Sequence, residues 1–154
     1  MGNTVAVFIF NKRAQVLIRK MKTALVFLCA AAGVFAQNLL LVEEQQLHHI
    51  HDACQANPAT RADHNLLHDL SANLDNPQVG VHMLCESKGV GLQNENGKLE
   101  KEVIRSKISL SIADPGIVDH LVEECAVPKN TPEKTAINLF MCFDRNGVTY
   151  FHEF

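Results

Sequence analysis

Cysteine is the residue type that most restricts how this chain can fold. Five cysteines occur, and Cys29 lies in an apolar amino-terminal segment, which leaves Cys54, Cys85, Cys125 and Cys142 further along the chain. An even number of cysteines in a small exported domain indicates disulfide bridges. Four cysteines can pair in three ways, and their spacing alone does not choose between them. No two of them have the close spacing of a zinc-binding pair, so a cysteine zinc site is not expected.

The amino-terminal segment, residues 1–36, is expected to be a secretory signal peptide. Lys22 precedes a short apolar run that ends in Val34-Phe35-Ala36, which is typical of a signal-peptidase site. The run is shorter than the roughly 20 residues of a membrane-spanning helix. Met21 is expected to be the working start, with residues 1–20 as an upstream extension; one long signal from Met1 would give the same mature chain. The folded domain is therefore expected over residues 37–154.

Charge is distributed unevenly along the chain. Residues 1–36 hold five Lys and Arg and no acid, whereas residues 37–154 hold nine against all seventeen acids, a formal charge of −8. Nucleic-acid binding needs clustered Lys and Arg, so a nucleic-acid partner is not expected. With 47% hydrophobic residues and a mean hydropathy of −0.01, the chain is neither a disordered tail nor a protein with several membrane spans.

Apolar residues recur with helical spacing after residue 37, which predicts an all-α domain. Asn76-Pro77, Asp114-Pro115 and Thr131-Pro132 each place a capping residue before a proline at the first helical position. A loop is expected over residues 89–97, which are rich in Gly and Asn. Four short helices are expected at about 41–56, 62–74, 77–89 and 98–111. A fifth is expected to start at Pro115 and end before Val127-Pro128, and a sixth to start at Pro132 and stop at Asn146-Gly147.

Six short helices after a signal peptide, with cysteines on the first, third, fifth and sixth, resemble the insect odorant-binding proteins of the pheromone and general odorant-binding family. Members of that family usually have six cysteines, and the four present here match the first, third, fourth and sixth. The other two positions hold Val81 and Glu133. The paired loss resembles the four-cysteine "minus-C" subgroup. Residues 85–97, with a Gly-Leu and an Asn-Gly turn, are similar to the family's stretch after its third cysteine.

The resemblance covers residues 37–154 and implies a compact six-helix domain with bridges Cys54–Cys85 and Cys125–Cys142. It also implies an apolar pocket that carries odorants, pheromones or other small lipophilic molecules without chemical change. No cofactor, metal or enzymatic activity is expected. The apolar side chains expected to line the pocket are Leu70, Leu74, Met83, Ile104, Ile108, Leu121, Phe140, Phe143, Tyr150 and Phe151. Without the resemblance, a solid core would be the expected arrangement of the same residues.

The resemblance further implies a place in sensillar lymph or haemolymph, with no stable membrane insertion. It allows an odorant receptor and a second copy of the chain as partners. All eight histidines lie after residue 36, so acidification would move residues 37–154 from about −8 toward neutrality. The resemblance suggests that mild acid loosens the helices and releases the ligand; the alternative is that the histidines are solvated surface residues.

The sequence carries only weak signals for other functions. His64 and His68 stand one helical turn apart, and a transition metal could bind them, but no H-E-x-x-H motif accompanies them. A nucleophile elbow and a phosphate loop are absent from the sequence. Asp144-Arg-Asn-Gly147 resembles part of a calcium loop, but Cys142 falls at the first ligand position. The main alternative is a secreted helical interaction or signalling protein with a solid core.

Overall fold

The structure is a computed structural model and describes residues 41–149. The expected signal peptide, and the expected pocket residues Tyr150 and Phe151, lie outside the described residues. By its internal contacts the chain divides into residues 1–42 and residues 43–154. The contacts between helices described for this fold lie within the second unit.

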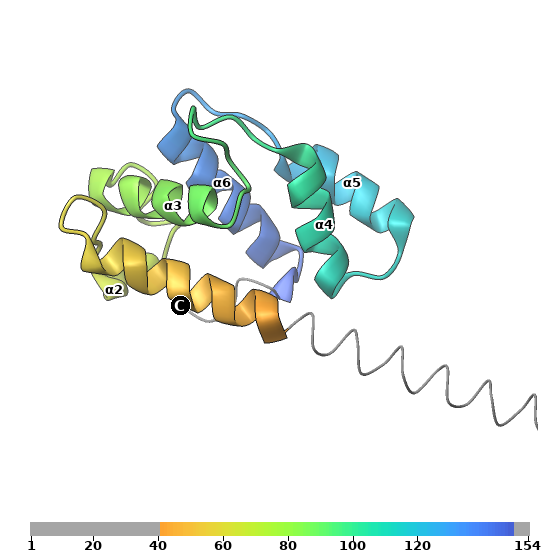
Figure 1. Cartoon of the computed structure of the whole chain (residues 1–154). Helices are drawn as coiled ribbons and strands as arrows, with labels where there is room; N and C mark the ends of the chain where they lie inside the picture. The colour runs from red at the N-terminus through yellow and green to blue at the C-terminus, as the bar shows by residue number, and fades with distance from the viewer. Residues whose placement is uncertain (1–40, 150–154) are drawn as a thin grey trace, which may run out of the picture. The chain divides into compact units, whose positions relative to one another are not determined.

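The described part of the chain is all-α, which confirms the predicted fold class (Figure 1). Residues 41–56 form the first helix. The helices that follow are α2 (His64–Leu67), α3 (Pro77–Gly89), α4 (Lys101–Ser111), α5 (Pro115–Cys125) and α6 (Pro132–Arg145). The β-structure among the described residues is limited to an isolated bridge between Gln93 and Leu99.

Three helices begin where the sequence places a capping residue before proline. The side chains of Asn76, Asp114 and Thr131 accept hydrogen bonds from the first free N–H groups of α3, α5 and α6. Asp114 Oδ1, for example, is 2.8 Å from the backbone nitrogen of Gly116. The following proline needs no hydrogen-bond partner for its nitrogen, so these starts are fixed locally.

The second helix is much shorter than expected, and the prediction of 62–74 is wrong in its extent. The helix ends at Leu67, and residues 68–75 form successive turns. The Asp69 carboxylate accepts hydrogen bonds from Ser71 Oγ at 2.7 Å and from the Ala72 nitrogen at 3.0 Å. The side-chain amide of Asn73 donates to the carbonyl of Asp69 at 2.8 Å. These side chains compete with the helical hydrogen bonds and replace them.

The fourth helix starts at Lys101 instead of residue 98 because the preceding residues close the expected loop. Asn94 N donates to Lys98 O at 2.9 Å, and Glu100 N donates to Leu92 O at 2.9 Å. Gly97 has a φ of 75° and therefore occupies the left-handed region that glycine adopts without strain. The loop prediction is confirmed.

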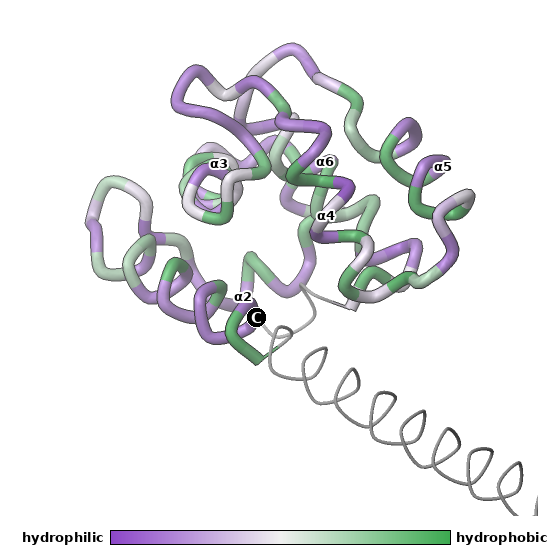
Figure 2. The backbone as a smooth tube through the Cα atoms, turned by 45° about the vertical axis from the view of Figure 1, so that its right-hand side comes forward, coloured by the Kyte–Doolittle hydropathy of each residue, from purple (hydrophilic) through white to green (hydrophobic). Residues whose placement is uncertain are grey.

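The core forms where α6 packs against α3 and α5, while α4 packs against α5. Figure 2 shows apolar and polar segments alternating along each helix, as expected when one side faces the core. The fully buried side chains of this core include Val79 on α3, Ile104 and Ile108 on α4, Val122 on α5, and Ile137, Leu139 and Phe143 on α6.

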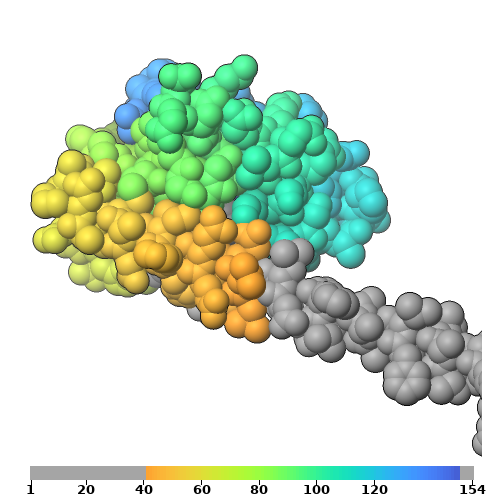
Figure 3. Space-filling model, in the orientation of Figure 1, coloured from red at the N-terminus to blue at the C-terminus, as the bar shows by residue number. Residues whose placement is uncertain are grey.

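Two disulfides join neighbouring helices, with the pairing that the resemblance implies. Cys54–Cys85 joins the first helix to α3, with Cα atoms 6.0 Å apart. Cys125–Cys142 joins α5 to α6, with Cα atoms 5.4 Å apart. Figure 3 shows the face on which the first helix (orange) lies against the α3 region (green). Each bridge therefore fixes one helix, α3 or α6, to a neighbouring helix.

Candidate functional site

A cavity of about 480 Å³ lies between α6, α3 and the segment around α2. Pockets for small organic molecules typically have volumes of about 300–1,000 Å³. The residues around it are Leu67, His68, Asp69, Leu70, Ser71, Met83, Glu86, Phe140, Met141, Asp144, Arg145 and Val148. The cavity is therefore large enough for a small ligand.

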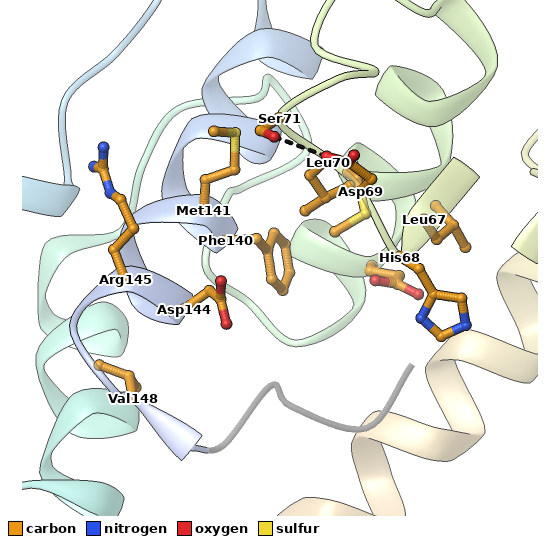
Figure 4. Close-up of a pocket in the computed structure, with 12 residues that line it drawn as sticks. Leu67, His68, Asp69, Leu70, Ser71, Phe140, Met141, Asp144, Arg145 and Val148 are labelled. Atoms are coloured by element: carbon orange, nitrogen blue, oxygen red, sulfur yellow. Dashed lines mark hydrogen bonds between the residues drawn. The ribbon is translucent and has the colours of Figure 1, made fainter. Parts of the chain in front are cut away.

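The wall of the cavity is part apolar and part polar. In Figure 4 the Phe140 ring extends from α6 toward the segment that carries Leu70. Asp69 and Asp144 supply carboxylates, Arg145 a guanidinium and His68 an imidazole. Hydrogen bonds from Ser71 and Ala72 lower the pKa of Asp69 below its ordinary value. The arrangement offers apolar surface to a hydrocarbon chain and polar groups to a head group.

Three of the expected pocket residues, Leu70, Met83 and Phe140, lie around this cavity. Leu74 is 40% exposed and is not among the lining residues. Ile104, Ile108, Leu121 and Phe143 are buried in the core away from the cavity wall. Ligand contact by any of these residues stays a prediction.

Sequence reasoning missed most of the other lining residues. Leu67 and Met141 are apolar, and they stand close in sequence to the expected Leu70 and Phe140. A wider apolar window around each expected residue could have found them. Glu86, Asp144 and Arg145 carry no such signal, because their place in the wall depends on how α3 and α6 pack.

A cluster of two buried residues, His82 and Glu86, and the partly buried His51 adjoins the cavity through Glu86. His51 Nδ1 lies 2.6 Å from Glu86 Oε1, and His82 Nε2 lies 2.9 Å from the same oxygen. His82 Nδ1 lies 2.9 Å from the carbonyl oxygen of Thr60. His82 and Glu86 are 0% and 1% exposed. The cluster thus links the first helix to α3 below the protein surface.

Burial and hydrogen bonding act in opposite directions on this cluster. Burial favours neutral His82, but the hydrogen bond and negative charge of Glu86, with the Thr60 carbonyl, outweigh it and raise the pKa of His82. Burial favours neutral Glu86 as well, but the hydrogen bonds from His51 and His82 outweigh it and lower the pKa of Glu86. The cluster therefore favours a positive charge beside an ionised carboxylate.

Two more imidazoles extend the cluster toward the cavity wall. The rings of His51 and His64 are 6.4 Å apart, and the rings of His64 and His68 are 4.5 Å apart in an edge-to-face arrangement. The expected neighbours His64 and His68 are thus in contact. His82 and Glu86 were not among the expected site residues, although residues four positions apart on one helix face are neighbours and this spacing is visible in the sequence.

Comparison with protein families gives a match over residues 36–146 to the PBP/GOBP family. The chain belongs to the PBP/GOBP family. PBP/GOBP proteins are all-α binding proteins and carriers of small hydrophobic molecules, not enzymes. Among residues 41–149, no helix has the length and apolar character needed to cross a membrane.

Two relatives of this PBP/GOBP chain are the B2 protein and the B1 protein of Tenebrio molitor. Each is 27% identical to it over 77 residues, which is 50% of this chain and 60% or 59% of the relative. The chain thus spans about 60% of the length of the curated relatives it matches.

Proposed function

We propose that this protein is a carrier that binds small hydrophobic molecules in the cavity between α6, α3 and the α2 segment. The observation that carries the proposal is a cavity of about 480 Å³, walled by Leu70, Met83 and Phe140, in a chain of the PBP/GOBP family. Burying a ligand's hydrocarbon chain there would contribute about 0.8 kcal/mol for each methylene group. The cargo is an odorant, a pheromone or another small lipophilic molecule, and it leaves unchanged.

The cavity favours this function over that of a solid-core interaction or signalling protein. A solid core would have the apolar helix faces closed on each other. Here Leu70 and Met141 are only partly buried, and both contribute to the wall of an open volume. Since family members are carriers and not enzymes, we also propose that this chain has no catalytic activity.

The protein is further proposed to be a secreted insect protein of the four-cysteine subgroup. Two disulfides support an oxidising compartment, and the apolar segment before residue 37 supports a signal peptide over 1–36 and a domain over 37–154. Sensillar lymph or haemolymph is the proposed location. An odorant receptor and a second copy of the chain are the proposed protein partners.

Release of the cargo on mild acidification is the last part of the proposal. His68 lines the cavity, where Asp69, Glu86, Asp144 and Arg145 also contribute charge, and its ring contacts that of His64. Imidazoles gain protons between about pH 7 and pH 5. The eight histidines together would move residues 37–154 from about −8 toward neutrality, which we propose loosens the helices and releases the cargo.

Native mass spectrometry of the oxidised protein secreted from insect cells tests the carrier function. Long-chain alcohols and aldehydes are added, and one adduct per chain is expected. The chain has no Trp, and Leu70→Trp places a bulky indole in the cavity wall. This variant is expected to lose most of the adduct. Ile117 is an exposed residue of α5, and Ile117→Trp is expected to keep the adduct.

The outcomes separate the two functions. If the correctly bridged chain takes up none of the compounds, the interaction or signalling function replaces transport. If Leu70→Trp binds as well as Ile117→Trp does, the ligand occupies another part of the molecule and the proposed cavity is wrong.

A further inference from the structure

The cluster of His51, His82 and Glu86 has a feature that cargo binding does not require. One potential ligand atom from each residue lies within 4.8 Å of the others, and two separate helices supply them. His82 and Glu86 stand one turn apart on α3, and His51 approaches from the first helix. Three potential metal ligands thus converge on one buried point.

His82 lies between two groups that accept hydrogen bonds. The Thr60 carbonyl oxygen lies 2.9 Å from Nδ1, and Glu86 Oε1 lies 2.9 Å from Nε2. A neutral imidazole has one N–H, so it can donate to only one of them. If that N–H donates to Thr60, the lone pair of Nε2 faces the carboxylate. A cation at this position, either a proton or a metal ion, removes the repulsion.

The second oxygen of Glu86 gives independent support for a cation. Oε2 is buried and has no hydrogen-bond partner among residues 41–149, in a side chain that is 1% exposed. A carboxylate oxygen buried without a partner is costly. A metal ion bound between the carboxylate and the two imidazoles would supply a partner for Oε2. A proton on His82 Nε2 would not, because it hydrogen-bonds to Oε1.

We propose that His51 Nδ1, His82 Nε2 and the Glu86 carboxylate bind one divalent transition-metal ion, for which zinc is the best match. Two imidazoles and a carboxylate suit zinc, whereas calcium and magnesium prefer oxygen ligands alone. Zinc ligands at about 2.0–2.1 Å in a tetrahedron stand about 3.3 Å apart. The present 2.6 and 2.9 Å separations from Glu86 Oε1 therefore need to widen by less than 1 Å. His51 Nδ1 and His82 Nε2 lie within 4.8 Å of each other and need to stand at the same tetrahedral separation.

The surroundings of His82 match those of a metal ligand. Histidines that bind metals commonly donate their other N–H to a backbone carbonyl, as Nδ1 of His82 can to Thr60. This bond fixes the ring so that Nε2 faces Glu86 and His51. With three protein ligands, the zinc ion would keep a fourth position for water. The metal would fasten the first helix to α3 beside the cavity wall.

The test uses the oxidised full chain without an affinity tag, freed of metal with EDTA and dialysed. Calorimetric titration with ZnCl₂ is expected to give one site per chain. Zinc at about 100 times its dissociation constant is expected to raise Tm by about 10 °C. MgCl₂ is expected to have no effect. Binding of Co²⁺ by the unaltered protein, followed by its visible absorption bands, reports the ligand set without any substitution.

Substitutions identify the ligands. His82→Gln and His51→Gln are each expected to weaken zinc binding by about 100-fold or more. Replacing a residue that only hydrogen-bonds to a metal ligand typically costs a smaller 10–100-fold in metal affinity. The matched control is His120→Gln, since His120 and Glu124 form a similar four-residue pair on exposed α5, 3.8 Å apart. The control should bind zinc as the unaltered chain does.

Two results would overturn the proposal. The first is an unaltered chain without stoichiometric zinc and without tetrahedral cobalt bands, which would make the cluster a buried ion pair only. The second is zinc binding that persists in folded His82→Gln, which would place the metal on surface histidines. No cargo is added in these measurements, so their outcome tests the zinc site separately from the carrier function.

Discussion

Nε2 of His82 lies 2.9 Å from Oε1 of Glu86, one turn further along α3, and both side chains are inaccessible to solvent. The same oxygen lies 2.6 Å from His51 on the first helix. The Cys54–Cys85 bridge joins the same two helices. A polar link and a covalent link therefore hold this pair of helices side by side.

Removing the carboxylate at the centre of the polar link should strongly destabilise the protein. Glu86→Ala leaves two imidazoles without their shared partner, and breaking one half of a buried ion pair costs about 3–5 kcal/mol. The free energy of unfolding, measured by guanidinium denaturation in EDTA, is expected to fall by that amount. Glu123→Ala removes the exposed partner of Lys101 and is expected to cost less than about 1 kcal/mol. Equal losses in the two variants would show that the buried link contributes little.

The two disulfides should stabilise the fold by similar amounts. Cys54–Cys85 closes 31 residues and Cys125–Cys142 closes 17. On the chain-entropy account each bridge contributes about 3–4 kcal/mol, the longer loop about 0.5 kcal/mol more. Double Cys→Ala variants of each pair are therefore expected to unfold at clearly lower guanidinium concentrations. A double variant as stable as the unaltered chain would contradict the contribution assigned to that bridge.

Local signals predicted most of the helices. Asn76-Pro77 fixes the start of α3 because the cap and the proline act on neighbouring backbone groups, whatever the rest of the chain does. The same local chemistry explains the error at 62–74. The side chains of Asp69 and Asn73 form hydrogen bonds with the nearby backbone, in competition with those of a helix. The spacing of apolar residues contains no information about that competition.

The site was less predictable than the fold. Met83 and Ile104 are both apolar, buried and helical, yet one lines the cavity and the other fills the core. The difference depends on where facing helices leave space, which one helix's periodicity does not encode. His51 and Glu86 are 35 residues apart, so their contact became visible only once the first helix and α3 were placed together.

Gly89, the last residue of α3, is expected to resist replacement by alanine. A Cβ atom there would overlap Cγ2 of Ile50, a branched side chain on the first helix. Gly→Ala usually stabilises a helix by about 0.5–1 kcal/mol, but this contact should reverse the sign to a loss of about 1–3 kcal/mol. Ser109→Ala, on the exposed side of α4, is the control and should change stability by no more than about 0.5 kcal/mol. Stabilisation by Gly89→Ala would mean that the two helices separate easily.

His68 should account for part of the acid sensitivity of cargo binding. The unaltered protein is expected to bind a long-chain alcohol more weakly at pH 5 than at pH 7, because residues 37–154 hold all eight histidines and lose net negative charge in acid. His68 is the histidine that lines the cavity, and His68→Gln keeps a polar side chain there without an imidazole, so its affinity ratio between the two pH values should move toward one. His120 on exposed α5 is 77% exposed at its side chain, and His120→Gln should retain the ratio of the unaltered protein. Displacement of a fluorescent naphthylamine probe at each pH measures all three proteins. Equal affinity of the unaltered chain at pH 7 and pH 5 would eliminate acid release, and an unchanged ratio in His68→Gln would assign it to groups other than His68.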